Sequence, residues 1–530
     1  MHLTRPVARA EQGMVATPHY LSSIAALEVL RDGGNAVDAA VTAAVTLGSV
    51  LPHMTGIGGD AFWLIYDAKS KSLRGINGSG PSGRLVKPDL FDRARGIPDR
   101  GPRSAITVPG AVDSWRLAYS SLGSLPLARL FEPAIFYARS GTPVTLGIAD
   151  WICQSAIPLQ NDAGCSEVFF QDGKSLPEGA RLSQPALAQT LESIASKGFR
   201  HFYDVTAQSV VKYLQSQDGL MTTDDFKQYQ AEWVTPISTR YRDYEAFQLP
   251  PPSQGITGLM ILNFLEYADI GKCEYNAIEY YDFLLKAIRW AFWRRDKWLT
   301  DPKFLNIPID ALLDPREARI AAQDATTLPT SKKDRAKQGS DTVFIATADK
   351  NGNAVGLVQS IYYDFGAAVL DPESGVLLQN RGAGFSLDVD HPNFLTPGKQ
   401  SATTLMSGML FSRGQPYMIH GTQGGEGQAQ TNAAIITRTI DFGLDIQQAI
   451  EAPRVLFGRS WGDSPDQVLI ESTVGDAVIH GLKLNGYPAT GVPWPNPRMG
   501  TAQGIKLKGV GCPFFEGGAD PRGEGLALGY

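Results

Sequence analysis

The stretch Gly339-Ser340-Asp341-Thr342-Val343-Phe344-Ile345-Ala346-Thr347-Ala348-Asp349 joins a charged, loop-like segment to an apolar run with the length of a β-strand. The turn signal Asn351-Gly352 follows it, and a second apolar run extends from Ala354 to Tyr362. Because Asn-Gly between two apolar runs favours a tight hairpin turn, the sequence predicts an antiparallel pair of buried strands. Thr342 then stands where the first strand begins.

The position of Thr342 is chemically significant if the chain is cut directly before it. The cut gives this threonine a free α-amino group, so that a hydroxyl nucleophile and an amine base belong to one residue. Threonine is nevertheless a common strand residue because it fits a pleated, half-buried surface. The rest of the chain must therefore support a catalytic role.

Composition narrows the class of protein. The chain has 530 residues, of which 43% are hydrophobic and 19% charged, as is usual for a globular protein with several domains or one large layered domain. A net charge of −6 argues against a nucleic-acid surface. The most apolar stretch, residues 36–50, contains Asp38 and is shorter than the ~20 residues that a membrane span needs. We expect neither nucleic acid nor membrane as a partner.

The N-terminus and the cysteines give further expectations. Met1 to Pro6 contains no apolar core of signal-peptide length, so the cytoplasm is the expected compartment. The cysteines are widely spaced and form no CxxC pair, which indicates neither a disulfide framework nor a zinc site. No metal or cofactor is expected. The cysteines are Cys153, Cys165, Cys273 and Cys512.

Local signals also predict helices near the N-terminus and in the middle of the chain. Thr17-Pro18 predicts a helix start, and Gly33-Gly34 predicts its end. An alanine-rich helix is expected from about Ala36 to Leu47, and a helix with an aromatic face over residues 274–300. Stripes of this kind usually face the core, and we interpret them so.

Two glycine clusters could belong to a functional site. The first, residues 52–60, lies between a helix and a following strand, whereas a phosphate-binding loop lies between a strand and a following helix. It therefore indicates a tight turn beside a pocket. The second, residues 421–427, precedes a helix predicted from about 429 to 442. Backbone N–H groups of such a glycine pair can stabilise an oxyanion, although a simple strand-to-helix turn explains the same residues.

Taken in order, these stretches make the chain similar to the γ-glutamyltranspeptidase family of N-terminal nucleophile hydrolases over nearly its whole length. One such motif is weak support, whereas many in one order are specific. The matching stretches are Gly33-Gly34-Asn35-Ala36-Val37-Asp38-Ala39-Ala40, Gly56-Ile57-Gly58-Gly59-Asp60, Thr107-Val108-Pro109-Gly110, Pro250-Pro251-Pro252-Ser253, Thr342 with Asp349-Lys350-Asn351-Gly352-Asn353-Ala354-Val355, Gly421-Thr422-Gln423-Gly424-Gly425, and Ala519-Asp520-Pro521-Arg522 through Gly529-Tyr530.

The resemblance implies an α+β protein with a four-layer αββα sandwich, made from one precursor that cleaves itself between Asp341 and Thr342. Residues 1–341 would form a large subunit with a flexible tail at 326–341. Residues 342–530 would form a small subunit, and the two together would make one domain. The resemblance leaves a higher homo-oligomer open.

The resemblance also implies a mechanism for a small-molecule amide substrate. Thr342 occupies the position of the family nucleophile, and its α-amine, with an ordinary pKa near ~7.7–8.0, suits base catalysis at neutral pH. Ser360 falls where the family has a second threonine that hydrogen-bonds the nucleophile. Gly424 and Gly425 match the oxyanion-hole glycines. An acyl-enzyme would form and water would hydrolyse it.

Four departures from the family concern substrate recognition. Asn77 replaces the arginine that binds the γ-glutamyl α-carboxylate, and Gly384 replaces the aspartate that binds the α-amino group. Thr404-Leu405 replaces two serines beside the site, and Tyr362 replaces an asparagine. Both charged contacts for an amino-acid head group are thus missing, and charge-assisted contacts are the strong ones.

Arg381 is then the best nearby candidate to bind a substrate carboxylate, the alternative being a structural arginine in a turn. Asn77, Tyr362 and Thr404 are further candidate substrate contacts. The favoured substrate is a small amide that bears a carboxylate, such as oxamate, the substrate of one subgroup of the family. Two alternatives stay open: a γ-glutamyl compound such as glutathione held by other residues, and an unprocessed, inactive homologue with a binding role.

Overall fold

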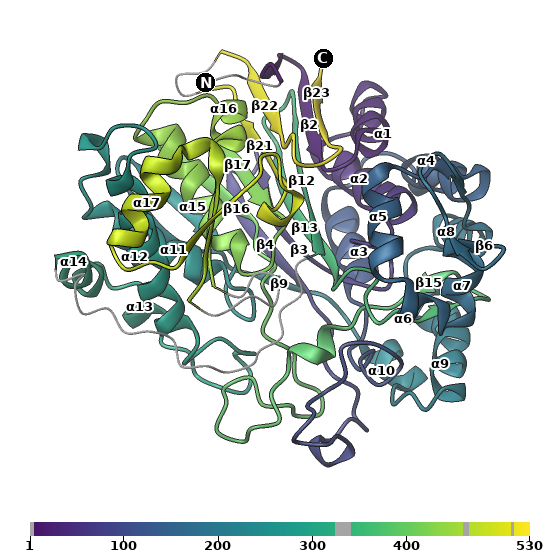
Figure 1. Ribbon diagram of the computed structural model, residues 1–530. Coiled ribbons are helices and arrows are strands. Elements are labelled where there is room, and N and C mark those ends of the chain that lie inside the picture. The colour runs from purple at the N-terminus through teal and green to yellow at the C-terminus, as the bar shows by residue number, and fades with distance from the viewer. Residues whose placement is uncertain (1–4, 324–340, 459–465, 510–512) are drawn as a thin grey trace.

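The computed structural model describes residues 5–323, 341–458, 466–509 and 513–530. Two seven-stranded sheets lie face to face, and helices cover the outer face of each (Figure 1). The expected αββα sandwich is confirmed. The expected flexible tail at 326–341 lies outside the described residues except for Asp341.

The first sheet contains the predicted hairpin at its centre. Its strand order is β23-β2-β12-β13-β3-β4-β9, and all neighbouring strands in it are antiparallel. In the hairpin, Ala346 pairs with Gly356. The strands are β2 (Gly13–Thr17), β3 (Asp60–Asp67), β4 (Ser72–Gly78), β9 (Glu232–Val234), β12 (Asp341–Asp349), β13 (Ala354–Tyr362) and β23 (Leu526–Gly529).

The second sheet packs on the first and is also antiparallel. Its strand order is β1-β22-β21-β17-β16-β11-β10. These strands are β1 (Ala8–Ala10), β10 (Ile237–Tyr241), β11 (Tyr244–Gln248), β16 (Gly408–Ser412), β17 (Gln415–Thr422), β21 (Ala502–Lys506) and β22 (Phe515–Ala519).

Shorter strands lie outside the two large sheets. A small separate sheet contains β18 (Val455–Phe457), β19 (Val468–Glu471) and β20 (Ala489–Val492). Two-stranded ribbons are formed by β5 (Thr142–Pro143) with β8 (Arg181–Leu182), β6 (Phe170–Gln171) with β7 (Lys174–Ser175), and β14 (Leu370–Asp371) with β15 (Val376–Leu377).

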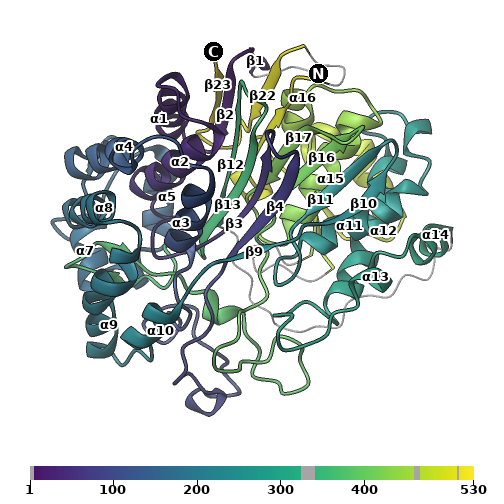
Figure 2. The ribbon, with the colours of Figure 1, turned by 180° about the vertical axis from the view of Figure 1, so that it is seen from behind.

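The helices form two outer layers, which Figure 2 shows on opposite sides of the sheets. The helices packed with the first sheet are α1 (Tyr20–Arg31), α2 (Ala36–Val50), α3 (Ala111–Leu122), α4 (Leu127–Ser140), α5 (Leu146–Gln154), α6 (Ala156–Gln160), α7 (Ala163–Phe169), α8 (Pro185–Lys197), α9 (Ala207–Ser216) and α10 (Thr223–Gln228). Those packed with the second are α11 (Gly255–Glu266), α12 (Ile278–Arg295), α13 (Ile309–Leu312), α14 (Pro315–Gln323), α15 (Gly427–Ile440), α16 (Ile446–Glu451) and α17 (Asp476–Leu484).

Alternation along the strands divides the core into layers. Successive side chains of a strand point to opposite faces. Phe62, Leu64 and Phe344 therefore lie between the two sheets, while Trp63 and Ile345 pack against the first helical layer. Both faces of the central hairpin are buried, which explains why its sequence is an almost continuous apolar run.

The start of the first helix differs from the expectation. Thr17 is the last residue of β2, and its hydroxyl donates to the carbonyl of His19 at 2.9 Å. His19 caps α1 instead, because its Nδ1 accepts from the N–H of Leu21 at 3.3 Å. The predicted alanine-rich helix is α2, which begins at Ala36 as expected.

Three further observations apply to the described ranges. No helix there is both long and apolar enough to cross a membrane. Cys153, Cys165 and Cys273 are free thiols, and Cys512 lies outside those ranges. No group of three His, Cys, Asp or Glu side chains in the described part of the chain could hold a metal ion.

Candidate active site

The candidate site lies where strands of the first sheet end at one edge of the sandwich. β12 begins at Asp341, which pairs with Tyr362 at the end of β13. Ser360 pairs in turn with Asp60 at the start of β3. Directly opposite residues of antiparallel strands lie close together, so this register brings together side chains that are distant in the sequence.

The hydroxyls of Thr342 and Ser360 meet at one carbonyl group. The carbonyl oxygen of Asp341 lies 2.7 Å from Thr342 Oγ1 and 2.5 Å from Ser360 Oγ. Ser360 Oγ also accepts from the N–H of Tyr362 at 2.7 Å, so its own proton is directed to the Asp341 carbonyl. A donor on this oxygen would polarise the carbonyl carbon for attack.

The glycine pair lies near this edge on the facing sheet. Gly421, near the end of β17, packs against the ring of Phe344, since a Cβ on this glycine would lie 2.2 Å from the ring. Three residues on, Gly424 and Gly425 have φ values of +125° and +53°, which favour glycine. Among the described residues, their N–H groups have no hydrogen-bond acceptor. Two unpaired donors of this kind can stabilise an oxyanion.

A buried network holds the glycine pair in place. Gln254 Nε2 donates to the carbonyls of Gly425 and Thr404 at 2.9 and 2.8 Å. Arg295 bonds Gln254 Oε1 at 3.3 Å and forms a buried ion pair with Glu426 at 2.6 Å. The sequence does not predict this network, because Arg295 stands at the end of a helix interpreted only as an aromatic core element.

Arg381 is buried and ion-paired, and one of its guanidinium nitrogens has no hydrogen-bond partner among the described residues. Its Nε lies 2.6 Å from Asp60 Oδ2, and its Nη1 donates to Thr403 Oγ1 at 2.8 Å. The side chain is only 1% exposed, and Nη2 has no hydrogen-bond partner among the described residues. Arg381 is thus partly structural, as the alternative interpretation held, and still has one donor available to an anion.

Asp60 orients this arginine. Its Oδ1 accepts from the N–H groups of Gly80 and Gly110 at 3.2 and 3.1 Å and from Gln379 Nε2 at 3.0 Å. Burial raises the pKa of Asp60, while Arg381 and these three donors oppose the rise. The sequence shows Asp60 in a glycine motif without indicating a partner for it.

Close backbone packing explains why the two residues directly before Asp60 are glycines. A Cβ on Gly58 would lie 2.1 Å from the carbonyl oxygen of Leu377, and one on Gly59 would lie 2.3 Å from that of Ser360. Backbone therefore packs directly on backbone here, which only glycine permits. This explains the cluster as a tight turn against the end of β13.

Tyr362 occupies the space beside Gly384. A Cβ added to Gly384 would lie 3.1 Å from the hydroxyl oxygen of Tyr362 and 3.1 Å from Ser401 Oγ. Tyr362 has a φ of +84°, which is uncommon for a residue other than glycine, and its ring centre lies 5.2 Å from Arg381 Cζ. A longer side chain at position 384 would therefore meet the phenol.

Asn77 is engaged by the protein itself. Its Nδ2 donates to Gln400 Oε1 at 2.9 Å, and its Oδ1 accepts from the N–H and the hydroxyl of Ser79 at 3.0 and 2.8 Å. Asn77 is 7% exposed. These bonds fix the amide at the end of β4 and leave its carbonyl oxygen with both acceptor positions in use.

The side chain of Asp341 is buried next to the peptide bond that joins it to Thr342. Neither carboxyl oxygen has a hydrogen-bond partner in the described part of the chain. Burial raises the pKa of Asp341 well above its usual range, the negative charge of Asp364 raises it further, and Arg100 opposes both. The folded protein thus retains a proton on this carboxyl at pH values where the unfolded chain has lost it.

Asp341 should therefore make the uncut protein less stable as the pH rises. Its contribution to stability is complete below the unfolded pKa of ~3.9 and is lost as the pH rises from there toward the folded pKa, at up to about 1.4 kcal/mol per pH unit. In a Thr342→Ala background, we expect Asp341→Asn to remove this dependence. Thermal unfolding from pH 4 to 8 tests it: the gap between the two melting temperatures should shift in favour of the Asn variant, and parallel curves would contradict the assignment.

Two antiparallel sheets between helical layers, with a threonine at the start of a central strand and a glycine pair near it, define the class of N-terminal nucleophile hydrolases. The family model of gamma-glutamyltranspeptidase matches residues 22–530. The chain belongs to this family.

The relatives include hydrolases with different names. Glutathione hydrolase-like YwrD proenzyme of Bacillus subtilis (strain 168) is 44% identical over 97% of this chain and 98% of its own. Oxamate amidohydrolase proenzyme of Klebsiella pneumoniae subsp. pneumoniae is 36% identical over 98% of both. The solved structure of cephalosporin acylase from Bacillus halodurans superposes with a TM-score of 0.90 at 31% identity, covering 100% of this chain and 98% of the other. The protein is thus an amidohydrolase of the gamma-glutamyltranspeptidase family.

Proposed function

We propose that the protein is a self-processing amidohydrolase whose nucleophile is Thr342. The observation that carries this proposal is the carbonyl of Asp341, which receives the hydroxyls of both Thr342 and Ser360 within hydrogen-bond distance. A nucleophile and a polarising donor at the same peptide are what cleavage at that peptide requires. The names of both relatives as proenzymes support it.

Maturation would proceed through an ester. Thr342 Oγ bonds to the carbonyl carbon of Asp341, the C–N bond breaks, and the proton from the hydroxyl passes to the departing nitrogen. Water then hydrolyses the ester, which restores the Thr342 hydroxyl and leaves Asp341 with a terminal carboxylate. The products are a large subunit, 1–341, and a small subunit, 342–530.

Turnover would repeat this chemistry on an external amide. The freed α-amine of Thr342 accepts the proton from Oγ as Oγ attacks the substrate carbonyl, and the same proton then leaves with the amine product. The N–H groups of Gly424 and Gly425 stabilise the oxyanion. Water resolves the acyl-enzyme and releases the acid.

For the acyl group we favour that of a small acid, such as the oxalyl group that oxamate carries. Arg381 Nη2 offers one cationic donor, which suits a single carboxylate. The Tyr362 phenol fills the space where a side chain at Gly384 would project, so no acidic group there can hold an α-amino group. The similarity to an oxamate amidohydrolase agrees with this choice. A glutathione hydrolase is the second candidate, favoured by the similarity to the YwrD protein.

Arg381→Lys is the variant that tests the acyl assignment. Lysine retains a charge for Asp60 but cannot also supply the guanidinium donor at Nη2. Losing a hydrogen bond to a charged group costs ~1.5–3 kcal/mol, so kcat/KM for oxamate should fall about 10- to 150-fold, mainly through KM. Arg381→Ala is unsuitable, because an unpaired buried charge on Asp60 would cost ~3–5 kcal/mol in stability.

The matched measurement compares substrates in the wild-type protein. We expect kcat/KM for oxamate to exceed that for γ-glutamyl amides, glutathione included. Arg129→Lys makes the same substitution at an arginine of α4 that pairs with Asp32 at 2.7 Å, and it should change neither value. A wide margin in favour of γ-glutamyl amides, or full oxamate activity in Arg381→Lys, would show that other residues bind the substrate.

A further inference from the structure

The carboxyl group of Asp341 takes no part in the maturation step of the proposed function, although it lies beside the bond that is cut. Asp341 is 0% exposed, and neither of its carboxyl oxygens has a hydrogen-bond partner among the described residues. Burial of a polar group without a partner costs free energy, so such groups are rare in folded proteins. This carboxyl is therefore a candidate for a role in the reaction of the adjacent bond.

The groups that face this carboxyl favour its neutral form. Burial raises the pKa of Asp341, and the negative charge of Asp364, in the loop after β13, raises it further. Arg100 acts in the opposite direction, but its Nη2 is paired with Asp364 Oδ1 at 3.0 Å. The backbone N–H of Asp364 also favours the charged form, and this is the weakest of the four effects. Asp341 thus carries a proton that it can donate.

Asp364 is fixed in this position by other contacts. Ser155, between α5 and α6, donates its hydroxyl proton to Asp364 Oδ2. Arg100 Nη1 donates to the carbonyl oxygens of Asp364 and Gly366, the latter at 2.5 Å. These contacts keep a charged carboxylate beside a neutral one. Two neighbouring carboxyls whose environments push their pKa values apart are typical of acid–base pairs.

The side chains of Asp341 and Thr342 lie on opposite faces of the first sheet. Along β12, Val343 packs against the first helical layer and Phe344 lies between the two sheets, and alternation places Thr342 on the same side as Phe344. Asp341 faces the helical side, because Asp364 lies beside it and is bonded by Ser155 of that layer. The hydroxyl and the carboxyl therefore approach the peptide bond between them from opposite sides.

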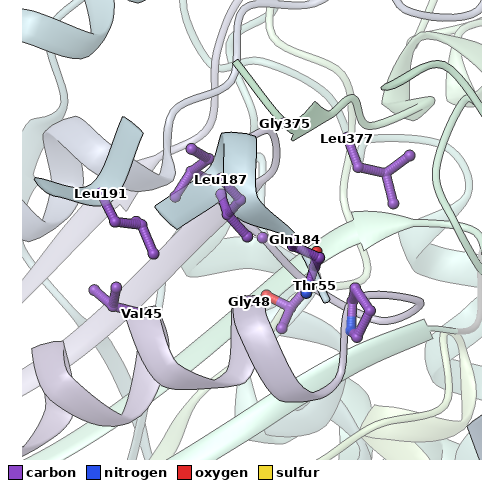
Figure 3. A pocket seen from close by; sticks show the side chains of 11 residues that line it. Val45, Gly48, Thr55, Gln184, Leu187, Leu191, Gly375 and Leu377 are labelled. Atoms are coloured by element: carbon purple, nitrogen blue, oxygen red, sulfur yellow. The ribbon is translucent and has the colours of Figure 1, made fainter. Parts of the chain in front are cut away.

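Water is a rival proton donor at this bond. Three cavities that the described residues line have volumes of about 20, 720 and 540 Å³, and Asp341 lines none of the three. The smallest has room for about one water molecule. It lies between α2 and α8 and is lined by Thr55, Gln184 and Leu187 among others (Figure 3). A water molecule in any of these three cavities does not line up with Asp341, whereas the carboxyl itself is already in place.

We propose that the Asp341 carboxyl is the acid of maturation, which protonates the nitrogen of Thr342 as the bond between the two residues breaks. The inference rests on the proposed function, which assigns Thr342 Oγ as the nucleophile. An amide nitrogen is a poor leaving group until it is protonated, so a positioned acid accelerates its departure. Attack by the hydroxyl from one face and protonation from the other fit the two side-chain positions.

The protons balance in this step. Thr342 Oγ bonds to the carbonyl carbon of Asp341, and the hydroxyl proton passes to the carbonyl oxygen, to which this hydroxyl donates at 2.7 Å. The carboxyl gives its proton to the nitrogen, and the C–N bond breaks. The carbonyl oxygen returns a proton to the carboxylate as the C=O bond forms again. The products are the ester, a free amine and a neutral carboxyl.

The test follows maturation of pulse-labelled, full-length protein from cell-free synthesis after dilution into buffers of pH 5 to 9. Hydroxylamine in denaturant stops the reaction and cleaves the ester, so that a gel reports the acyl shift itself. We expect the wild-type rate to be constant at low pH. Above the pKa of Asp341 it should fall about 10-fold per pH unit, because only the neutral carboxyl donates.

Asp341→Asn retains the shape of the side chain and removes the acid. We expect it to mature ~10²–10⁴-fold more slowly at pH 6, without the decline at high pH, because a positioned acid contributes about that much. Asp341→Glu restores a carboxyl and should recover at least about 10-fold of the loss together with the decline at high pH. Thermal unfolding in the Thr342→Ala background shows whether each variant folds.

Asp364→Asn tests the environment of the acid. A neighbouring charge shifts a pKa by about 1–3 units, so the decline in rate should begin at least about one pH unit lower than in the wild type. A purely structural role would slow maturation equally at every pH. Asp67→Asn is the matched control, because Asp67 bonds Ser70 at the end of β3 opposite to Asp60, and it should change neither rate nor pH profile.

The variants separate this inference from the proposed function. If Thr342→Ala stays uncut while Asp341→Asn matures at the wild-type rate and pH profile, the acid assignment fails and the nucleophile assignment stands. An unchanged pH profile in Asp364→Asn would also contradict the acid assignment. If Thr342→Ala is cut but the double variant with Asp341→Asn is not, the Asp341 carboxyl is itself the nucleophile and both assignments fail.

Discussion

Thr342→Ala is expected to leave one full-length chain on a denaturing gel and to abolish amide hydrolysis. The methyl group that remains cannot attack the Asp341 carbonyl, so neither the ester nor the free α-amine forms. Removing a catalytic nucleophile typically costs on the order of 10⁶-fold in kcat, and here the base is lost with it. The measurement is the gel together with oxamate turnover.

Two matched variants sharpen this prediction. Thr347→Ala makes the same substitution in the same strand, at a buried threonine whose hydroxyl donates to the Ala36 carbonyl at 2.7 Å instead of the scissile group. It should still yield two chains. Thr342→Ser retains a hydroxyl and should process. Two chains from Thr342→Ala would show that another residue cleaves the precursor or that cleavage is external.

Ser360→Ala should slow both maturation and turnover while the fold is retained. Its hydroxyl donates to the Asp341 carbonyl at 2.5 Å, and β13, which carries it, pairs directly with the strand of Thr342. A positioned proton donor or acceptor contributes ~10²–10⁴-fold. Processing is followed by gel after cell-free synthesis, and turnover is measured on protein that has matured to completion.

Two further substitutions at position 360 distinguish a hydrogen-bonding role of the Ser360 hydroxyl from a packing role of the side chain. Ser360→Thr restores the hydroxyl and should recover most of both rates, whereas Ser360→Cys has similar size but a weak donor and should not. Melting temperatures of the variants should agree within a few degrees. Wild-type rates in Ser360→Ala would assign Ser360 to packing alone.

The central hairpin can be predicted from the sequence because its signals are local. Apolar runs on both sides of Asn351-Gly352 specify the turn and the burial together. The layered fold is expected only through the resemblance to the family, which rests on the order of several motifs and not on any one of them. The prediction that α1 starts at Thr17 is wrong, because both Thr17 and His19 can supply a capping acceptor and the pairing of β2 decides between them.

The contacts of the recognition residues cannot be predicted in this way, because they depend on the register of distant strands. Asp60 and Arg381 form an ion pair, yet the sequence shows each only in its own motif. The Tyr362 phenol beside Gly384 follows from a left-handed backbone conformation that tyrosine rarely adopts. The cavity of about 720 Å³ that Pro18, Trp151 and Gln423 help to line is assembled from separate strand ends and α5, so no single stretch of the sequence indicates it.

Intact-mass spectrometry of the purified wild-type protein tests the central claim most directly. We expect two masses, corresponding to residues 1–341 and 342–530, with the smaller chain beginning at Thr342. A single mass for residues 1–530, or a smaller chain that begins at any other residue, would contradict the assignment of Thr342 as the N-terminal nucleophile.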